Sequence, residues 1–141
     1  MGKYSGAIPI LLIANIVIFA VSSVPDVKEE MRSLFALYFP QNENFKYWQF
    51  VTSMFMHGGF AHILFNMYAL WAFGSPLEQI WGKNRFLVFY FLSGIGAGII
   101  YILVNYFQFN AIYNDMVSQD ISVGDIQRLL ETGQFDNSVF A

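Results

Sequence analysis

The stretch YWQFVTSMFMHGGFAHILFNMYALWAFGSPL, residues 47–77, contains no Asp, Glu, Lys or Arg, yet it carries His62 and Asn66. In an α-helix each residue advances by about 100°, so side chains four positions apart lie one turn from each other on the same face. His62 and Asn66 can therefore point at one small volume. Because hydrogen-bonding side chains are costly in a segment apolar enough to cross a bilayer, this pair predicts a functional site.

The composition predicts an all-α membrane protein. Residues of the AVILMFWYC set make up 56% of the 141 residues, charged residues make up only 12%, and the charges cluster outside three long apolar runs, with Glu78 near the end of the second. Each run is long enough to cross a hydrocarbon core of about 30 Å. We therefore expect three transmembrane helices, at about residues 7–24, 60–80 and 86–107. For the first run we favour a retained helix over a cleavable signal peptide, because it is longer than a usual signal core.

The segments between these helices are polar or amphipathic. Residues 26–39 carry apolar side chains at helical spacing, which predicts a short helix that either lies in the membrane interface or is an ordinary connecting helix. Residues 26–46 together form the expected interfacial loop. Residues 81–85 form a polar turn with two of the seven basic residues. By the positive-inside rule this turn, and with it the amino terminus, is expected on the cytoplasmic side, most simply of a bacterial cytoplasmic membrane.

The third apolar run contains the small-xxx-small pair Gly94 and Gly98, and a second such pair begins one residue earlier. Small residues at this spacing let another helix approach closely. The same glycines also occur in membrane helices without a packing role. We favour close packing at this face.

The chain changes character after residue 109, and residues 110–141 are polar and acidic. We expect a partial membrane domain over residues 1–109, and a tail or the start of a loop beyond it. Ser122 and Asp125 are spaced as in a capping box, which predicts one short soluble helix. The apolar residues expected on one face of that helix are Ile126, Leu129 and Leu130.

Charge and residue content exclude several other classes of protein. The net charge is only −3 and the basic residues are dispersed, so no nucleic-acid partner is expected. The absence of cysteine excludes disulfide bonds, thiol catalysis and thiolate metal sites. No glycine-rich phosphate-binding motif is present, and no cofactor is predicted.

The chemistry of His62 and Asn66 points to stabilisation of a negative charge. Imidazole and amide N–H groups are donors, and two donors aimed at one point suit an oxygen that gains negative charge during acyl transfer. Three alternatives remain: packing residues that bond to neighbouring helices, metal binding by His57 and His62, and a proton or ion path. The five-residue spacing of the two histidines disfavours a metal. Gly58 and Gly59 indicate that His57 precedes the helix that carries His62.

The sequence from Trp48 to Asn66, followed by GSPLE at 74–78 and WG at 81–82, closely resembles the rhomboid intramembrane serine proteases. The resemblance implies a core of six membrane helices, of which this chain covers the first half. It implies that transmembrane proteins in the lipid bilayer are the substrates and that the remaining rhomboid helices are partners.

The resemblance also assigns roles to individual residues. His62 and Asn66 match the oxyanion-stabilising positions, and His57 matches the first histidine of the motif, whose role is structural. Glu78 matches a carboxylate near the cytoplasmic end of the second helix. Trp48 is followed by Gln49, whereas the family commonly has a Trp-Arg pair at these positions. The anchoring role of that arginine is therefore in doubt for this chain. Gln49 can still donate hydrogen bonds.

The family's nucleophile and base have no counterpart in these 141 residues. No G-x-S-G sequence occurs, His57 and His62 are the only histidines, and neither Ser75 nor Ser138 is in a suitable context. The first hypothesis is therefore the amino-terminal portion of a rhomboid protease, inert as given. The second is a pseudoprotease that binds membrane helices through the small-residue face of the third helix. A helix-bundle component of a transporter or electron carrier is a third, weaker interpretation.

Overall fold

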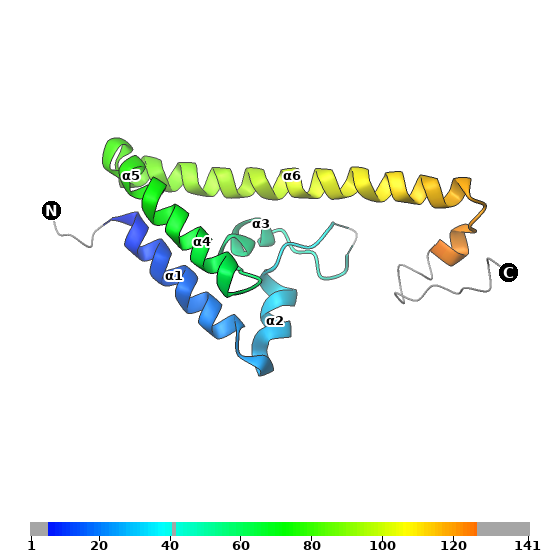
Figure 1. Cartoon of the computed structure of the whole chain (residues 1–141), viewed down its shortest axis with the longest axis horizontal. Helices are drawn as coiled ribbons and strands as arrows, with labels where there is room; N and C mark the ends of the chain where they lie inside the picture. The colour runs from blue at the N-terminus through cyan, green and yellow to red at the C-terminus, as the bar shows by residue number, and fades with distance from the viewer. Residues whose placement is uncertain (1–5, 41, 127–141) are drawn as a thin grey trace. The chain divides into compact units, whose positions relative to one another are not determined.

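The computed structural model describes residues 6–40 and 42–126, and within these ranges every regular element is helical. The chain divides into two compact units, residues 1–100 and 101–141, which are described separately. Figure 1 shows the α-helices, which are α1 (Ala7–Ser22), α2 (Pro25–Phe35), α3 (Gln49–Thr52), α4 (Phe60–Ala69), α5 (Ser75–Trp81) and α6 (Lys83–Ser118). A 3₁₀ turn, Ser53–Phe55, follows α3, and a π-helical segment, Leu70–Gly74, joins α4 to α5.

Helix α1 forms from the first apolar run but ends at Ser22, two residues before the expected end. The reason is Pro25, because the residue before a proline avoids the helical conformation. Val24 accordingly has an extended backbone and serves as the N-cap of α2, with Pro25 in its first turn. The hydroxyls of Ser22 and Ser23 donate to the carbonyl of Phe19 and close the last turn of α1.

Helix α2 ends at Phe35, earlier than the expected end near residue 39. Its last carbonyl groups are bonded by side chains from α3 and the residue before it, so the chain turns away before Pro40. The indole of Trp48 donates to the carbonyl of Leu34 at 2.9 Å, and the hydroxyl of Thr52 donates to that of Phe35 at 2.9 Å. These contacts between distant residues replace the helical bonds that would continue α2.

The second expected membrane helix begins at Phe60, as predicted, and its backbone stays helical to Trp81. The π-helical segment inside it ends at Gly74, where α1 comes close. A Cβ atom at Gly74 would lie 2.6 Å from the Cδ1 of Ile8, so a side chain there would push α1 away. Gly82 then reverses the chain with φ +81°, a conformation that favours glycine, and α6 begins at Lys83.

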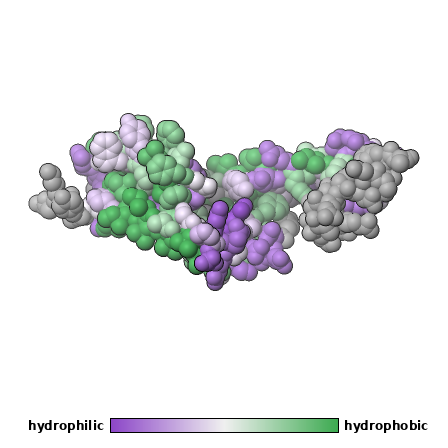
Figure 2. Space-filling view, turned by 60° about the horizontal axis from the view of Figure 1, so that its bottom comes forward, coloured by the Kyte–Doolittle hydropathy of each residue, from purple (hydrophilic) through white to green (hydrophobic). Residues whose placement is uncertain are grey.

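The core of the first unit lies where α1 meets the start of α6. Partly buried side chains from the 3₁₀ turn, the π-helical segment and α5 pack against it. The opposite side of α1 is apolar and exposed, whereas α2 is hydrophilic, as the space-filling view shows (Figure 2). The buried core residues are Ala7, Ile8, Leu11 and Phe86.

Helix α6 is longer than expected, since it starts three residues earlier and continues to Ser118. Within the described ranges it is the one helix both long and apolar enough to cross a membrane, and α1 is apolar but shorter. Helix α6 therefore continues past the expected end near residue 107 and through the first part of the polar segment that begins at residue 110. Asn105 and Asn110 are accommodated because each amide donates to the carbonyl four residues earlier, at 2.7 and 2.9 Å.

In the second unit, α6 ends in a Schellman motif. Asp120 has φ 62°, and the amides of Asp120 and Ile121 donate to the carbonyls of Val117 and Met116, both at 3.2 Å. A short helical turn follows at residues 123–126.

The predicted capping box begins that short turn in a modified form. The Asp125 amide donates to the Ser122 hydroxyl at 3.1 Å, while that hydroxyl donates to the Asp125 carboxylate at 2.5 Å. The rest of the predicted helix, including Leu129 and Leu130, lies outside the described residues.

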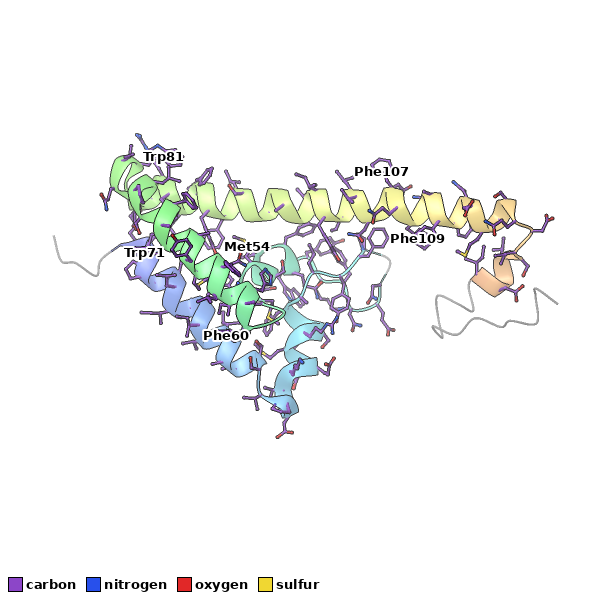
Figure 3. All side chains as sticks on the ribbon, viewed as in Figure 1. Met54, Phe60, Trp71, Trp81, Phe107 and Phe109 are labelled. Atoms are coloured by element: carbon purple, nitrogen blue, oxygen red, sulfur yellow. The ribbon has the colours of Figure 1, made fainter. Side chains whose placement is uncertain are left out.

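The small-residue face of α6 is covered within the first unit. Met54 lies against Gly94, close enough to occupy the space of a side chain there (Figure 3). A Cβ atom at Gly98 would lie 3.1 Å from the Phe50 ring and 3.2 Å from the Leu37 side chain. The neighbours of this face are therefore the segment 50–54 and the loop after α2, so it is not a free docking surface.

Replacing Gly94 with leucine should lower the free energy of unfolding by about 1–3 kcal/mol, because Met54 and its neighbours must move to admit the new side chain. Gly96→Leu is the matched control, since nothing lies within 4 Å of a Cβ at Gly96. Thermal and chemical unfolding in detergent measure both variants. Equal stability of the two would contradict the packing described for Gly94.

Candidate functional site

His62 and Asn66 lie one turn apart in α4, on a face that is exposed in this unit. Ile63, between them in sequence, is 6% exposed and faces the packed side. The helix thus orients the two polar side chains away from its own core contacts. Their donor groups are accessible to a molecule that approaches the exposed face of α4.

The break at Gly58 and Gly59 brings His57 next to His62. Gly59 has a fully extended backbone (φ 177°, ψ 171°), and the two imidazole rings have centroids 5.1 Å apart at an interplanar angle of 61°. His57 and His62 therefore do not lie on one continuous helix, and their five-residue spacing does not by itself prevent joint metal binding. Among the described residues, however, no three potential metal-binding side chains gather at one point.

A backbone contact favours one tautomer of His62. The amide of Gly58 donates to its Nδ1 at 3.4 Å, a long hydrogen bond in which Nδ1 is the acceptor. A neutral imidazole with Nδ1 as acceptor carries its proton on Nε2. His62 can therefore offer an Nε2–H donor, the group that stabilisation of an oxyanion requires.

His57 is partly buried, and this burial lowers its pKa from the ordinary value of about 6.5. Its Nδ1 lies 3.2 Å from the carbonyl oxygen of Phe55, which acts in the opposite direction, and the proximity of His62 lowers the pKa further. His57 is therefore neutral at pH 7.

Gln49 is completely buried, and its amide joins the end of α2 to two parts of the loop that follows α2. Its Nε2 donates to the carbonyls of Ser33 and Asn44 at 3.2 and 2.8 Å, with a longer contact to Leu34. Its Oε1 accepts from the amides of Tyr38 and Lys46 at 3.3 and 3.1 Å. Glutamine thus both donates and accepts, whereas an arginine at this position only donates.

Glu78 connects the second expected membrane helix to the first. Its two carboxylate oxygens accept from the backbone amides of Ala7 and Ile8, at 2.5 and 3.1 Å. These amides belong to the first turn of α1, which has no carbonyl partners for them. A Cβ atom at Gly6 would lie 2.9 Å from the Glu78 carboxylate, so the small residue there keeps the approach open.

Sequence reasoning missed one buried polar residue, Asn15. It is 0% exposed, its Nδ2 donates to the carbonyl of Leu11 at 2.7 Å, and its Oδ1 has no hydrogen-bond partner among the described residues. A single amide inside the first apolar run was the available signal. Thr52, which bonds to α2, carried no signal that distinguishes it from an ordinary helix residue.

Comparisons with known proteins agree with the sequence pattern. The Rhomboid domain profile matches residues 44–124, more than half of the chain. The chain therefore belongs to the rhomboid family.

The matched relatives come from a bacterium, a parasite and a plant. The chain is 39% identical over 54 residues to Rhomboid protease GluP of Bacillus subtilis, covering 38% of this chain and 11% of that protein. It is 30% identical over 99 residues to Rhomboid-like protease 3 of Toxoplasma gondii, covering 67% of this chain and 38% of that protein. It is 38% identical over 61 residues to Inactive RHOMBOID-like protein 8 of Arabidopsis thaliana, covering 43% of this chain and 17% of that protein. The chain thus spans less than two fifths of each relative, and no solved structure matches it.

Replacing Gln49 with leucine should destabilise the unit by about 2–4 kcal/mol, because several loop carbonyls and amides lose their partner in a buried position. Gln49→Arg should keep the donors but leave the Tyr38 and Lys46 amides unpaired, with a smaller loss. Limited proteolysis between residues 36 and 47, together with unfolding in detergent, measures both effects. Gln119→Leu, at an exposed position, is the control, and an equal effect there would refute the anchoring role.

Stability should also depend on pH through His57. Its folded pKa lies below its unfolded pKa, so the unfolded state binds the extra proton and stability falls as pH decreases through and below about 6.5. The His57→Gln variant should lose this part of the pH dependence. Unfolding curves at a series of pH values between 5 and 8 provide the measurement. An unchanged slope in the variant would show that His57 does not contribute.

Proposed function

We propose that this chain forms the first three membrane helices of a rhomboid intramembrane serine protease and provides its oxyanion donors. One observation carries the proposal: His62 and Asn66 share an exposed face of α4, inside the segment that matches the Rhomboid domain. The protease activity itself is what the names of matched relatives such as Rhomboid protease GluP state of those proteins.

Two of the three proposed membrane helices are long enough to cross a hydrocarbon core of about 30 Å, whereas α1 is shorter and would need its flanking residues or local thinning of the bilayer. The 16 residues of α1 extend about 24 Å, and the helical backbone from Phe60 to Trp81 extends about 33 Å. Helix α6, with 36 residues, exceeds the thickness of a hydrocarbon core, so part of it projects into the aqueous phase. The protein is then an integral multi-pass protein, with residues 1–109 as its membrane part and residues 110–141 as the tail or connection beyond it.

In the proposed orientation the amino terminus and the turn at residues 81–85 face the cytoplasm. The His57–His62 pair and the loop held by Gln49 then lie toward the opposite side. Trp48 and Tyr47, exposed by 51% and 84%, are suited to the membrane interface there. A bacterial cytoplasmic membrane is the proposed location.

The proposed reaction is attack of a serine hydroxyl on a peptide bond of a transmembrane protein. The carbonyl oxygen becomes an oxyanion, which His62 Nε2–H and the Asn66 amide stabilise. The contact from Gly58 to Nδ1 keeps the His62 proton on the side that serves this purpose. Gln49, Trp48 and Glu78 act indirectly, by holding the loop and the first helix around α4. His57 has a structural role beside His62.

The serine nucleophile and the histidine base must come from other polypeptide, because these 141 residues contain neither G-x-S-G nor a third histidine. The chain by itself is therefore proposed to be inert, and the remaining rhomboid helices are its proposed partners.

A chimera tests the oxyanion assignment. The 54 matched residues of Rhomboid protease GluP are replaced by those of this chain, and cleavage of a fluorescent transmembrane substrate is measured in proteoliposomes. The chimera should be active, and His62→Ala or Asn66→Ala should each lower kcat by about 10²–10³, with KM little changed.

Tyr68→Phe, on an exposed part of α4, is the control and should keep full activity. Activity that survives loss of both His62 and Asn66 would refute the assignment. Serine-independent cleavage by this chain alone would refute the proposed mechanism.

A pseudoprotease that binds membrane helices is the second candidate. It is favoured by the match to Inactive RHOMBOID-like protein 8 and by the lack of G-x-S-G in this sequence. Because Met54 and Phe50 cover the glycines of α6, we place its binding surface on the exposed face of α4 instead. Binding of a transmembrane peptide by this chain alone, reduced by substitutions on that face, would favour this candidate.

A further inference from the structure

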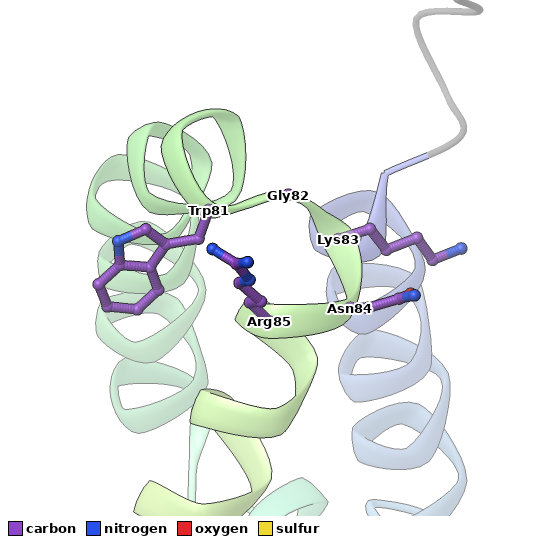
Figure 4. A pocket seen from close by; sticks show the side chains of 5 residues that line it. All are labelled: Trp81, Gly82, Lys83, Asn84 and Arg85. Carbon is purple, nitrogen blue, oxygen red and sulfur yellow. The ribbon is translucent and has the colours of Figure 1, made fainter.

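The turn between α5 and α6 forms an exposed basic surface that the proposed protease chemistry does not use. An open depression of about 340 Å³ lies at this turn. Figure 4 shows Arg85 beside Trp81, while Lys83 and Asn84 extend to the other side. The lining residues, all exposed, are Trp81, Gly82, Lys83, Asn84 and Arg85. We call them the turn surface.

The turn surface presents positive charge and few competing acceptors. Lys83 and Arg85 are two cations within three residues, and the first backbone amides of α6 have no carbonyl partner in the helix. The first amide that is bonded is that of Phe86, which donates to the carbonyl of Gly82 at 3.1 Å. The nearest carboxylate in sequence, Glu78, is already bonded to the amides of Ala7 and Ile8.

Apolar side chains adjoin these charges. Trp81 packs edge-on against Phe89, with ring centroids 5.2 Å apart, and Ile80 is 76% exposed. Tryptophan with lysine or arginine is the combination found where membrane helices end at the headgroup level. A ligand for this surface therefore carries a negative group and an apolar portion side by side.

We propose that the turn surface binds the headgroup phosphate of an anionic phospholipid such as phosphatidylglycerol. Arg85, beside Trp81, contacts the phosphate, and Lys83 adds a second positive charge at the same turn. Trp81 and Ile80 lie against the glycerol and the upper acyl chains. The proposal rests on the part of the proposed function that sets α5 and α6 across a membrane, because that arrangement holds the turn at the headgroup level. The proposal is independent of the protease chemistry, because the test measures lipid binding and not peptide cleavage.

Native mass spectrometry of the detergent-solubilised protein, titrated with phosphatidylglycerol or phosphatidylcholine, tests the proposal. The unmodified chain should bind phosphatidylglycerol more tightly. The double variant K83Q/R85Q should bind it about 30-fold more weakly, since each basic residue near an anionic headgroup contributes about 1 kcal/mol. The control K28Q/R32Q removes the same charge from two exposed positions on α2, where acidic residues surround them, and should leave binding unchanged.

Each other outcome decides against the proposal. Equal binding by K83Q/R85Q and the unmodified chain, or an equal loss in K28Q/R32Q, would show that no site exists at the turn. Competition by inorganic phosphate as effective as by phosphatidylglycerol would show a free-phosphate site instead of a lipid site.

A separate labelling experiment tests the membrane arrangement. Asn84→Cys introduces the only cysteine of the chain, and a membrane-impermeant maleimide should label it from one side of sealed vesicles. Absence of labelling from both sides would refute the arrangement of α5 and α6, a result distinct from loss of lipid binding.

Discussion

The two hydrogen bonds that the Glu78 carboxylate accepts from the amides of Ala7 and Ile8 hold the first unit together. They satisfy two amides at the start of α1, at residues that are almost completely buried, and an unsatisfied buried amide is costly. They also set the position of α1 along α5, so that Ile8 meets the bare backbone of Gly74 and packs beside Phe86. The buried core of the unit follows from this alignment.

Gln49 likewise supplies hydrogen-bond partners for backbone groups, at the end of α2 and in the loop that follows it. The loop after α2 has no regular structure to pair its backbone groups, so the single buried amide of Gln49 bonds to backbone groups in two parts of the loop and to the Ser33 carbonyl near the end of α2. Trp48 and Thr52 complete the set by bonding the last carbonyls of α2. A short segment after the loop therefore decides where α2 ends. The loop thereby becomes a defined structure, in which the side chain of Leu37 lies against Gly98 of α6.

The proposed catalytic pair depends on these constraints only indirectly. The shared face of His62 and Asn66 is a property of any α-helix with polar residues four positions apart. The position of His57 beside His62 instead requires the extended backbone at Gly59, and the contact from Gly58 to His62 depends on the same break. Two adjacent glycines thus convert a separated pair of histidines into neighbours. The turn at residues 81–85 is a further local feature, and its basic side chains remain outside the packed unit.

The amino-acid sequence alone determined the helical class, from composition, and the pairing of His62 with Asn66, from helical periodicity. The sequence also determined the start of α4 at Phe60, from the break at Gly58 and Gly59, and the family, from its resemblance in the motif residues that begin at Trp48. It did not determine the end of α2, the partners of Gln49 and Glu78, the cover over Gly94 or the continuation of α6 beyond residue 110. Hydrogen bonds and packing between distant residues decide the first three of these. For α6, Asn105 and Asn110 direct their amides to the backbone of their own helix, so polar composition did not end it. Local patterns record which conformation a segment prefers, whereas only the folded chain shows which distant group satisfies each buried backbone atom.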